Sequence, residues 1–178
     1  MALLIKLLKF LGYGVLALIA ISFFLPGSVH MVRQIEIAAP SAKIFNETNE
    51  LKNWNDWSPW AKIDPNTKYT YSQPTTAGEG AYFNWTSNDK NVGNGKQTIL
   101  SVKTNELIRS RTDFEGMGTS TSDFKFVAKD STHTQVSWSF DMDLGLNPIM
   151  RFIGLKMESF VAPDYERGLA NLKAVCEK

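Results

Sequence analysis

The feature that most constrains the fold is a succession of strand-length segments between residues 68 and 143, separated by short turns rich in Gly, Asn and Asp. Apolar and polar residues alternate along them, most clearly where Val136, Trp138 and Phe140 share one face. Such short connections make consecutive strands antiparallel neighbours, and this alternation predicts a sheet with one apolar face. The expected strands, with one more that precedes them, are 31–39, 68–73, 80–87, 94–103, 106–114, 119–129 and 133–143.

An amphipathic helix is predicted after the last strand, beginning at Pro148. Pro163 either kinks this helix or begins a second one. The apolar sheet face needs cover, and this helix is the only large element available, so the sheet should curl around it. The chain is therefore expected to be an α+β protein with about seven antiparallel strands. One apolar stripe at helical spacing consists of Val161, Tyr165, Leu169, Leu172 and Val175.

Two short segments separate the first strand from the second. Pro40 begins a short helix that ends near residue 47. In residues 51–65, three tryptophans recur at steps of three while prolines interrupt any long helix, which predicts a short helix followed by an ordered loop. The tryptophans either pin this loop over the core or gate a cavity. They are Trp54, Trp57 and Trp60.

An apolar run from Phe10 to Leu25 precedes the domain. As a helix it spans roughly 24 Å, somewhat less than a hydrocarbon core of about 30 Å. Lys6 and Lys9 can snorkel toward headgroups and lengthen the span, and Pro26 ends it. An uncleaved signal anchor is the favoured interpretation, and a cleaved signal peptide or a buried core helix are the alternatives.

The chain accordingly divides into an N-terminal transmembrane anchor at 1–28 and one domain at 29–178. Positive charge before the span, and none just after it, favours a cytoplasmic N-terminus. The domain would then lie outside the cytoplasm, in the periplasm if the source is bacterial.

The charge balance argues against nucleic acid as a partner. The whole chain carries a formal charge of +1, and without Lys6 and Lys9 the remainder has 17 basic and 18 acidic residues. Nucleic-acid binding needs a basic face, which this balance does not supply. Cys176 is the single cysteine, so no disulfide forms within the chain and no cysteine-rich metal site exists. We expect no metal and no cofactor.

The few candidates for acid–base or charged chemistry have ordinary interpretations. His133 lies at an expected hairpin and His30 follows the apolar segment, so both should be solvated. Arg109, Arg111 and Asp113 alternate along one strand face and either point to water or place an arginine against a ligand carboxylate or phosphate. No catalytic residue is expected.

Small hydroxyl groups on the inferred inner faces are the best indication of a pocket. Serines at those positions leave volume unfilled and can form hydrogen bonds with a ligand, while aromatic residues supply apolar walls. The expected cavity-lining residues are Trp85, Ser110, Phe114, Ser122, Phe124, Trp138 and Phe140.

Several short matches recur in a fixed order over about residues 31–177. They are Val32, Arg33, Ile35, Ile37, Ala39 and Pro40, then Ile44 and Phe45, Trp54, Trp57, Ser58, Pro59 and Trp60, Asp64 and Pro65, Gly80, Ala81 and Trp85, Gly93 and Gly95, Thr134 to Trp138, and Gly168, Leu169, Leu172 and Lys173. In this order they resemble the START-like (SRPBCC) superfamily, specifically its polyketide cyclase/dehydratase-like group. The resemblance implies a helix-grip (Bet v 1-like) fold with an apolar cavity between the curled sheet and the long helix.

The favoured function is a membrane-anchored binding domain for a small hydrophobic ligand, such as a lipid, an isoprenoid or an aromatic metabolite. One alternative is an enzyme of the cyclase/dehydratase type, and another is a protein-interaction domain related to chaperone regulators. The sequence contains no readable nucleophile–base pair and no cofactor motif, which disfavours the enzyme. A membrane anchor suits an apolar ligand.

Overall fold

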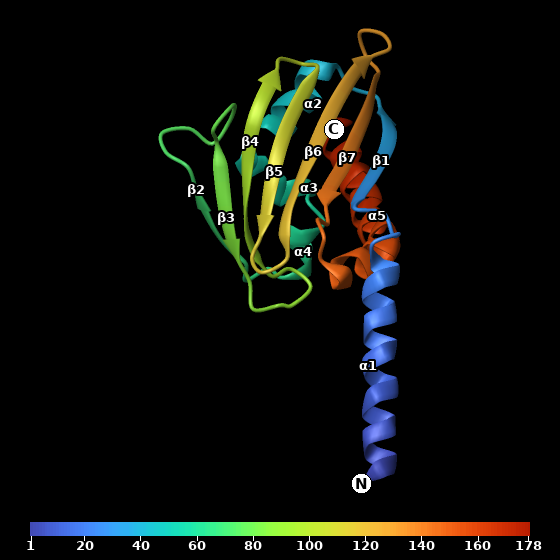
Figure 1. Cartoon of the computed structure of the whole chain (residues 1–178). Coiled ribbons are helices and arrows are strands. Elements are labelled where there is room, and N and C mark those ends of the chain that lie inside the picture. Colours follow the sequence, from blue (N-terminus) through green and yellow to red (C-terminus); the bar gives the residue numbers. More distant parts are fainter.

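A computed structural model describes residues 1–178, apart from the side chain of Ala2 (Figure 1). All seven strands that the alternation predicts are present, each within three residues of its expected bounds. The elements are α1 (Ala2–Ser22), β1 (Ser28–Ile37), α2 (Ser41–Asn49), the 3-10 turn η1 (Leu51–Asn53), α3 (Trp54–Trp57), α4 (Trp60–Ile63), β2 (Lys68–Tyr71), β3 (Tyr82–Thr86), β4 (Asn94–Lys103), β5 (Leu107–Phe114), β6 (Gly118–Ala128), β7 (Thr134–Asp143) and α5 (Pro148–Cys176).

The strands form one antiparallel sheet in the order β1-β7-β6-β5-β4-β3-β2. Short turns place β2 to β7 side by side in chain order, as expected. The first strand instead crosses to the far edge and pairs with β7, so that Ser28 lies opposite Asp143 and Ile37 opposite Thr134. The sheet curves around α5, which packs against its apolar face (Figure 1).

The C-terminal helix is a single helix that continues through Pro163. Asn147 caps its start by accepting hydrogen bonds from the backbone N–H groups of Ile149 and Met150, and Pro148 occupies the first turn. Pro163 is exposed, so water can reach the carbonyl of Ser159, which has no helical donor opposite it. The alternative of a second helix beginning at Pro163 is therefore wrong.

The predicted apolar stripe of α5 faces the sheet. Tyr165, Leu169 and Leu172 are buried, and Val161 and Val175 pack partly buried beside them. This burial stabilises the fold by roughly 1.5–3 kcal/mol for each fully buried leucine. The exposed positions between them complete the amphipathic pattern that the sequence indicates.

Residues 51–65 form short helices where the sequence predicts a loop after one helix. Trp57 is fully buried, its Nε1 donates to the carbonyl of Glu47, and its own carbonyl accepts from Asn171 Nδ2 at 3.0 Å. Trp54 Nε1 donates to the carbonyl of Thr48 at 2.8 Å. The tryptophan segment is therefore pinned between α2 and α5, and Asn171 of α5 takes part in holding it.

The N-terminal helix α1 extends away from the domain (Figure 1). It is long and apolar enough to cross a membrane, and none of its apolar window is buried, so the alternative of a buried core helix is wrong. Arg151 of α5 joins its end to the domain by donating from Nη1 to the carbonyls of Ser22, Phe23 and Leu25, while Nε donates to the carbonyl of Gly145.

Candidate functional site: an apolar cavity under the sheet

A cavity of about 370 Å³ lies between the apolar face of the sheet and the helices α3, α4 and α5. Its size is within the usual range for small-molecule sites, about 300–1,000 Å³. The walls are dominated by aromatic rings from seven elements. These are Trp54, Trp60, Tyr69, Tyr71, Phe83, Trp85, Phe114, Trp138, Phe140, Phe160 and Tyr165.

Of the seven residues that the sequence suggested for the cavity, Trp85, Phe114, Ser122, Trp138 and Phe140 line it. The other two face the same side of the sheet but do not reach the cavity. Ser110 is 2% exposed and lies behind its wall, and Phe124 is covered by the edges of Trp54 and Trp57. Alternation indicates the face of a residue, but how deep the cavity extends depends on the helices packed there.

The tryptophan segment packs over the core, one of the two roles left open by the sequence, and two of its rings also reach the cavity. Trp57 pins its segment in the core, whereas Trp54 and Trp60 line the cavity. Trp60 packs edge-on against Trp138 and Tyr165, with ring centroids 6.1 and 6.2 Å apart. The segment therefore both closes the core and forms one cavity wall.

One connected set of hydrogen bonds brings polar groups to the otherwise apolar cavity. Thr112 Oγ1 donates to Gln97 Oε1 at 2.9 Å, and Gln97 Nε2 donates to Ser110 Oγ at 3.1 Å. Ser110 Oγ and Ser122 Oγ lie 3.0 Å apart. Gln97, Thr112 and Ser122 line the cavity. The sequence interpretation missed Gln97, although its position two residues before the buried Ile99 places it on the inner face.

Two charged side chains belong to the cavity lining. Lys90 from the β3–β4 loop and Asp164 from α5 line the cavity, and Asp164 pairs with Arg167. The side chain of Asp164 is 22% exposed, and Lys90 is exposed. Tyr165 is the buried ionisable group of the wall, and burial raises the pKa of its hydroxyl well above its ordinary value.

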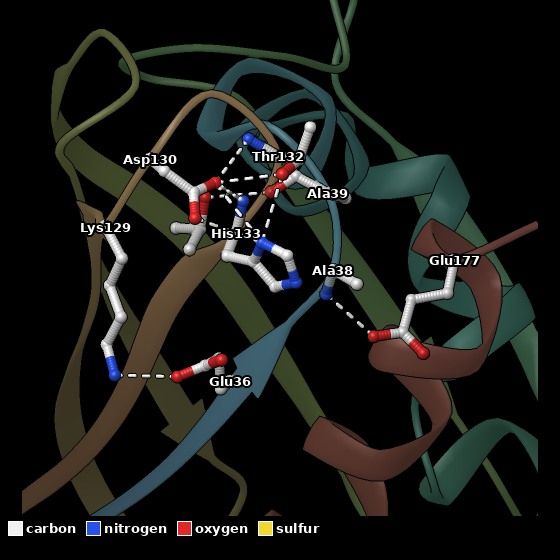
Figure 2. Close-up of polar contacts among 9 residues, drawn as sticks. Glu36, Ala38, Ala39, Lys129, Asp130, Thr132, His133 and Glu177 are labelled. Atoms are coloured by element: carbon white, nitrogen blue, oxygen red, sulfur yellow. Dashed lines mark hydrogen bonds and ion pairs between the residues drawn. The ribbon is translucent and has the colours of Figure 1, made fainter.

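Neither histidine lines the cavity. Figure 2 shows His133 in the exposed β6–β7 hairpin, where Asp130 Oδ1 accepts from the backbone N–H of His133 at 2.7 Å. His30 pairs with Asp141 on the outer face of the sheet. In the part of the chain that the structure describes, no three His, Cys, Asp or Glu side chains are grouped so as to hold a metal ion.

The charged strand face of β5 points to water. Arg109 donates from Nε and Nη2 to the two carboxylate oxygens of Asp123, each at 2.7 Å. Arg111 donates from Nε to Asp113 Oδ2 at 3.2 Å. The alternative that one of these arginines binds a ligand inside the sheet is wrong, because both arginines are exposed on the opposite face.

An antiparallel sheet closed by one long C-terminal helix around an apolar cavity defines a helix-grip protein. Residues 28–177 match the family described as polyketide cyclase / dehydrase and lipid transport. The chain belongs to this family, which confirms the resemblance inferred from the sequence. No curated protein matches the chain in a sequence search.

Solved structures share the fold at low sequence identity. An aromatase/cyclase from a Streptomyces species superposes with a TM-score of 0.63 and 14% identity, covering 84% of this chain and 94% of that one. Truncated norcoclaurine synthase from Thalictrum flavum gives 0.64 and 15%, covering 85% and 95%. The same enzyme in complex with dopamine and hydroxybenzaldehyde gives 0.63 and 14%, covering 83% and 86%.

Proposed function

We propose that the protein is a membrane-anchored binding domain whose cavity holds a small hydrophobic molecule. The observation that carries this proposal is the cavity of about 370 Å³, walled by aromatic rings and supplied with a few polar groups at defined positions. A pocket of this composition holds an apolar body by shape and orients it through one or two polar contacts. Trp85, Ser122, Trp138 and Phe140 are the wall residues on which we expect binding to depend most.

The N-terminal helix supports the proposal that the domain takes an apolar ligand from a membrane. Helix α1 presents its apolar side chains to the surroundings, a situation that suits a hydrocarbon core and not water. Lys6 and Lys9 at its start, with no acidic residue before Glu36, favour a cytoplasmic N-terminus and a domain outside the cytoplasm.

A second candidate is an enzyme of the cyclase/dehydratase type. The similar folds of an aromatase/cyclase and of norcoclaurine synthase, together with Lys90 and Asp164 at the cavity rim, favour it. Both ionisable groups lie at the opening rather than deep in the cavity, and Asp164 is paired with Arg167. We therefore place binding first. A purely protein-interacting domain would not need the cavity.

Uptake of N-phenyl-1-naphthylamine, which fluoresces in apolar surroundings, tests the proposal. Ser122→Phe places a ring in the cavity and should reduce uptake by the full chain at fixed detergent concentration. His133→Ala, in the far hairpin, is the matched control and should leave uptake unchanged. Equal uptake by the parent and Ser122→Phe, with circular dichroism of both unchanged, would refute a binding cavity.

A further inference from the structure

We propose that the cavity selects ligands that carry a carbonyl-type oxygen, because its polar wall offers hydrogen-bond donors in excess. This inference rests on the proposed binding function and specifies the chemistry of the ligand. Ser122 and Gln97 form the donor site, and they are 5% and 6% exposed. Gln97 lines the cavity from β4 and Ser122 from β6, the strands on either side of β5.

The direction of the hydrogen bonds follows from counting protons. The oxygen Gln97 Oε1 can only accept, so the hydroxyl hydrogen of Thr112 is committed to it. Gln97 Nε2 donates to Ser110 Oγ, which leaves the hydrogen of Ser110 free to donate onward. Its neighbour is Ser122 Oγ, 3.0 Å away.

Ser122 is therefore the last residue of this series of hydrogen bonds. If Ser122 instead donated to Ser110, the hydrogen of Ser110 would have no acceptor. Ser110 does not line the cavity, so no ligand could supply one, and a buried unpaired donor is costly. With Ser110 donating, the O–H of Ser122 has no protein acceptor among the described residues and remains for a ligand. The second N–H of Gln97 Nε2 likewise has no acceptor there. Two free donors at one place select an acceptor oxygen.

A pair of probes of equal shape tests this selection. 2-Acetylnaphthalene carries a carbonyl oxygen, and 2-isopropylnaphthalene replaces it with a methyl group. Ser122→Ala in the full chain should weaken binding of the acetyl probe roughly 3- to 10-fold in Kd, the value of one hydrogen bond, and leave the isopropyl probe unchanged. Both are titrated by quenching of tryptophan fluorescence at one detergent concentration, so that partition into detergent cancels between variants.

Thr112→Val is the matched control because it removes the hydroxyl at the other end of the series of hydrogen bonds. It should weaken the acetyl probe less than Ser122→Ala does. If Thr112→Val weakened binding of the acetyl probe and Ser122→Ala did not, the inference would be overturned, since the hydrogen bonds would then be donated in the opposite direction. Equal binding of the acetyl probe by the parent and Ser122→Ala would overturn it as well. Failure of both probes to bind the parent would instead count against the binding function itself.

A separate observation concerns the end of the domain from which α1 leaves. The geometry points to a bilayer surface seated against this end, so that the cavity opens toward lipid. Figure 1 shows the β3–β4 loop, the β5–β6 turn and the start of α5 at the same end as the top of α1. Of these, the β3–β4 loop and the β5–β6 turn contribute cavity-lining residues, among them Lys90 and Met117.

Large apolar side chains are exposed at this end, beside polar ones such as Lys90 and Glu115. Met117 in the β5–β6 turn is 61% exposed, Leu146 before α5 is 71% exposed and Ile149 in the first turn of α5 is 70% exposed. Ile153 and Phe160 continue the surface of Ile149 along one face of α5, at spacings of four and seven residues. An exposed apolar surface of this extent marks an interaction site.

Two relationships identify lipid as the partner. Arg151 fixes this surface beside the end of α1, whose own apolar side chains are exposed. The surface is therefore continuous with the proposed membrane anchor. Met117 and Phe160 belong both to this surface and to the cavity lining, so an apolar path joins the bilayer to the cavity. A ligand would exchange with the membrane without crossing water.

Depth-dependent quenching in nanodiscs of phosphatidylcholine and phosphatidylglycerol tests this arrangement. The full chain carries one environment-sensitive nitrobenzoxadiazole probe at a time, on Met117→Cys or Ile149→Cys, while the native Cys176 is 1% exposed. Brominated lipids should quench both probes and their emission should be shifted to the blue. Val127→Cys is the control, since Val127 is equally exposed and apolar but lies at the other end of β6.

Tyr13→Cys within α1 separates the two possible failures. If its probe is quenched and those at 117 and 149 are not, the domain stands clear of the bilayer and this inference is wrong. If the probe at 13 is not quenched either, the anchor itself is wrong. Energy transfer between labelled copies in place of lipid quenching would assign the surface to a second copy of the chain and also overturn the inference.

Discussion

The ring of Tyr165 lies against that of Trp138, with centroids 3.9 Å apart and planes 30° from parallel. Trp138 in turn stacks on Phe124 at 4.6 Å, so α5, β7 and β6 are joined by three successive rings. Tyr165 and Trp138 also line the cavity. Two of the three rings that join the helix to the sheet therefore also form part of the cavity wall.

Substitutions of Tyr165 should separate its ring from its hydroxyl. The hydroxyl has no hydrogen-bond partner among the described residues, so Tyr165→Phe should change the free energy of unfolding by no more than about 0.5 kcal/mol. Tyr165→Ala removes the stacked ring and should cost roughly 3–5 kcal/mol. Thermal unfolding of the full chain in detergent, followed by near-ultraviolet circular dichroism, measures both. A large loss in Tyr165→Phe would mean that the hydroxyl is structurally engaged.

The apolar stripe of α5 predicts which leucines matter. Leu169 and Leu172 are 2% and 0% exposed, and replacing either by Ala should cost roughly 2–5 kcal/mol. Arg167→Ala removes only an exposed ion pair with Asp164 and should stay within about 0.5 kcal/mol. Denaturant titrations that gave equal losses for all three variants would contradict the burial of this face.

A glycine in α5 is needed for the helix to approach the sheet. A Cβ on Gly168 would lie 2.8 Å from Trp138 Cζ3 and 3.3 Å from Pro59 Cδ. Gly168→Ala should therefore destabilise the fold by roughly 1–3 kcal/mol, although alanine is ordinarily the better helix former. Gly14→Ala in α1, where a Cβ meets nothing within 4 Å, is the matched control and should not lower the melting temperature.

The fold was largely predictable because it rests on local patterns. Period-two alternation located all seven strands, and the stripe that includes Tyr165 and Leu172 identified the helix that covers them. The crossing of β1 to the far edge gives no local signal, because pairing of Ile37 with Thr134 depends on residues far apart in the chain. The placement of β1 at that edge was therefore not predicted from the sequence.

The site was less predictable than the fold. Ser122 and Phe140 lie on the cavity wall because alternation reports which face a residue occupies. Phe124 shares that face but does not line the cavity, because Trp54 and Trp57 of α3 pack edge-on against it, and helix position is not encoded in the strand itself. Gln97 was missed because alternation with Ile99 gives only its face, and a polar side chain is not expected to be buried there until its partner Ser110 is known.

The single cysteine should behave as a buried thiol. Burial raises the pKa of Cys176 from its ordinary 9.0 to about 11. Because the folded pKa is raised, the associated stability is fully present below pH 9 and is lost as the pH rises toward 11. Iodoacetamide at pH 8 should alkylate Cys176 slowly in the native protein and rapidly in urea. Rapid alkylation of the native protein, at the rate of an exposed cysteine on Val127→Cys, would contradict this burial.

Native mass spectrometry of the detergent-purified full chain tests the central proposal most directly. We predict that the parent protein, after incubation with an extract of the membranes from which it was purified, carries a small apolar molecule at substantial occupancy. Ser122→Phe, which fills the cavity, should carry little or none while keeping the same fold. A parent protein that remains empty, or a Ser122→Phe variant that retains the same molecule at the same occupancy, would contradict a ligand-binding cavity.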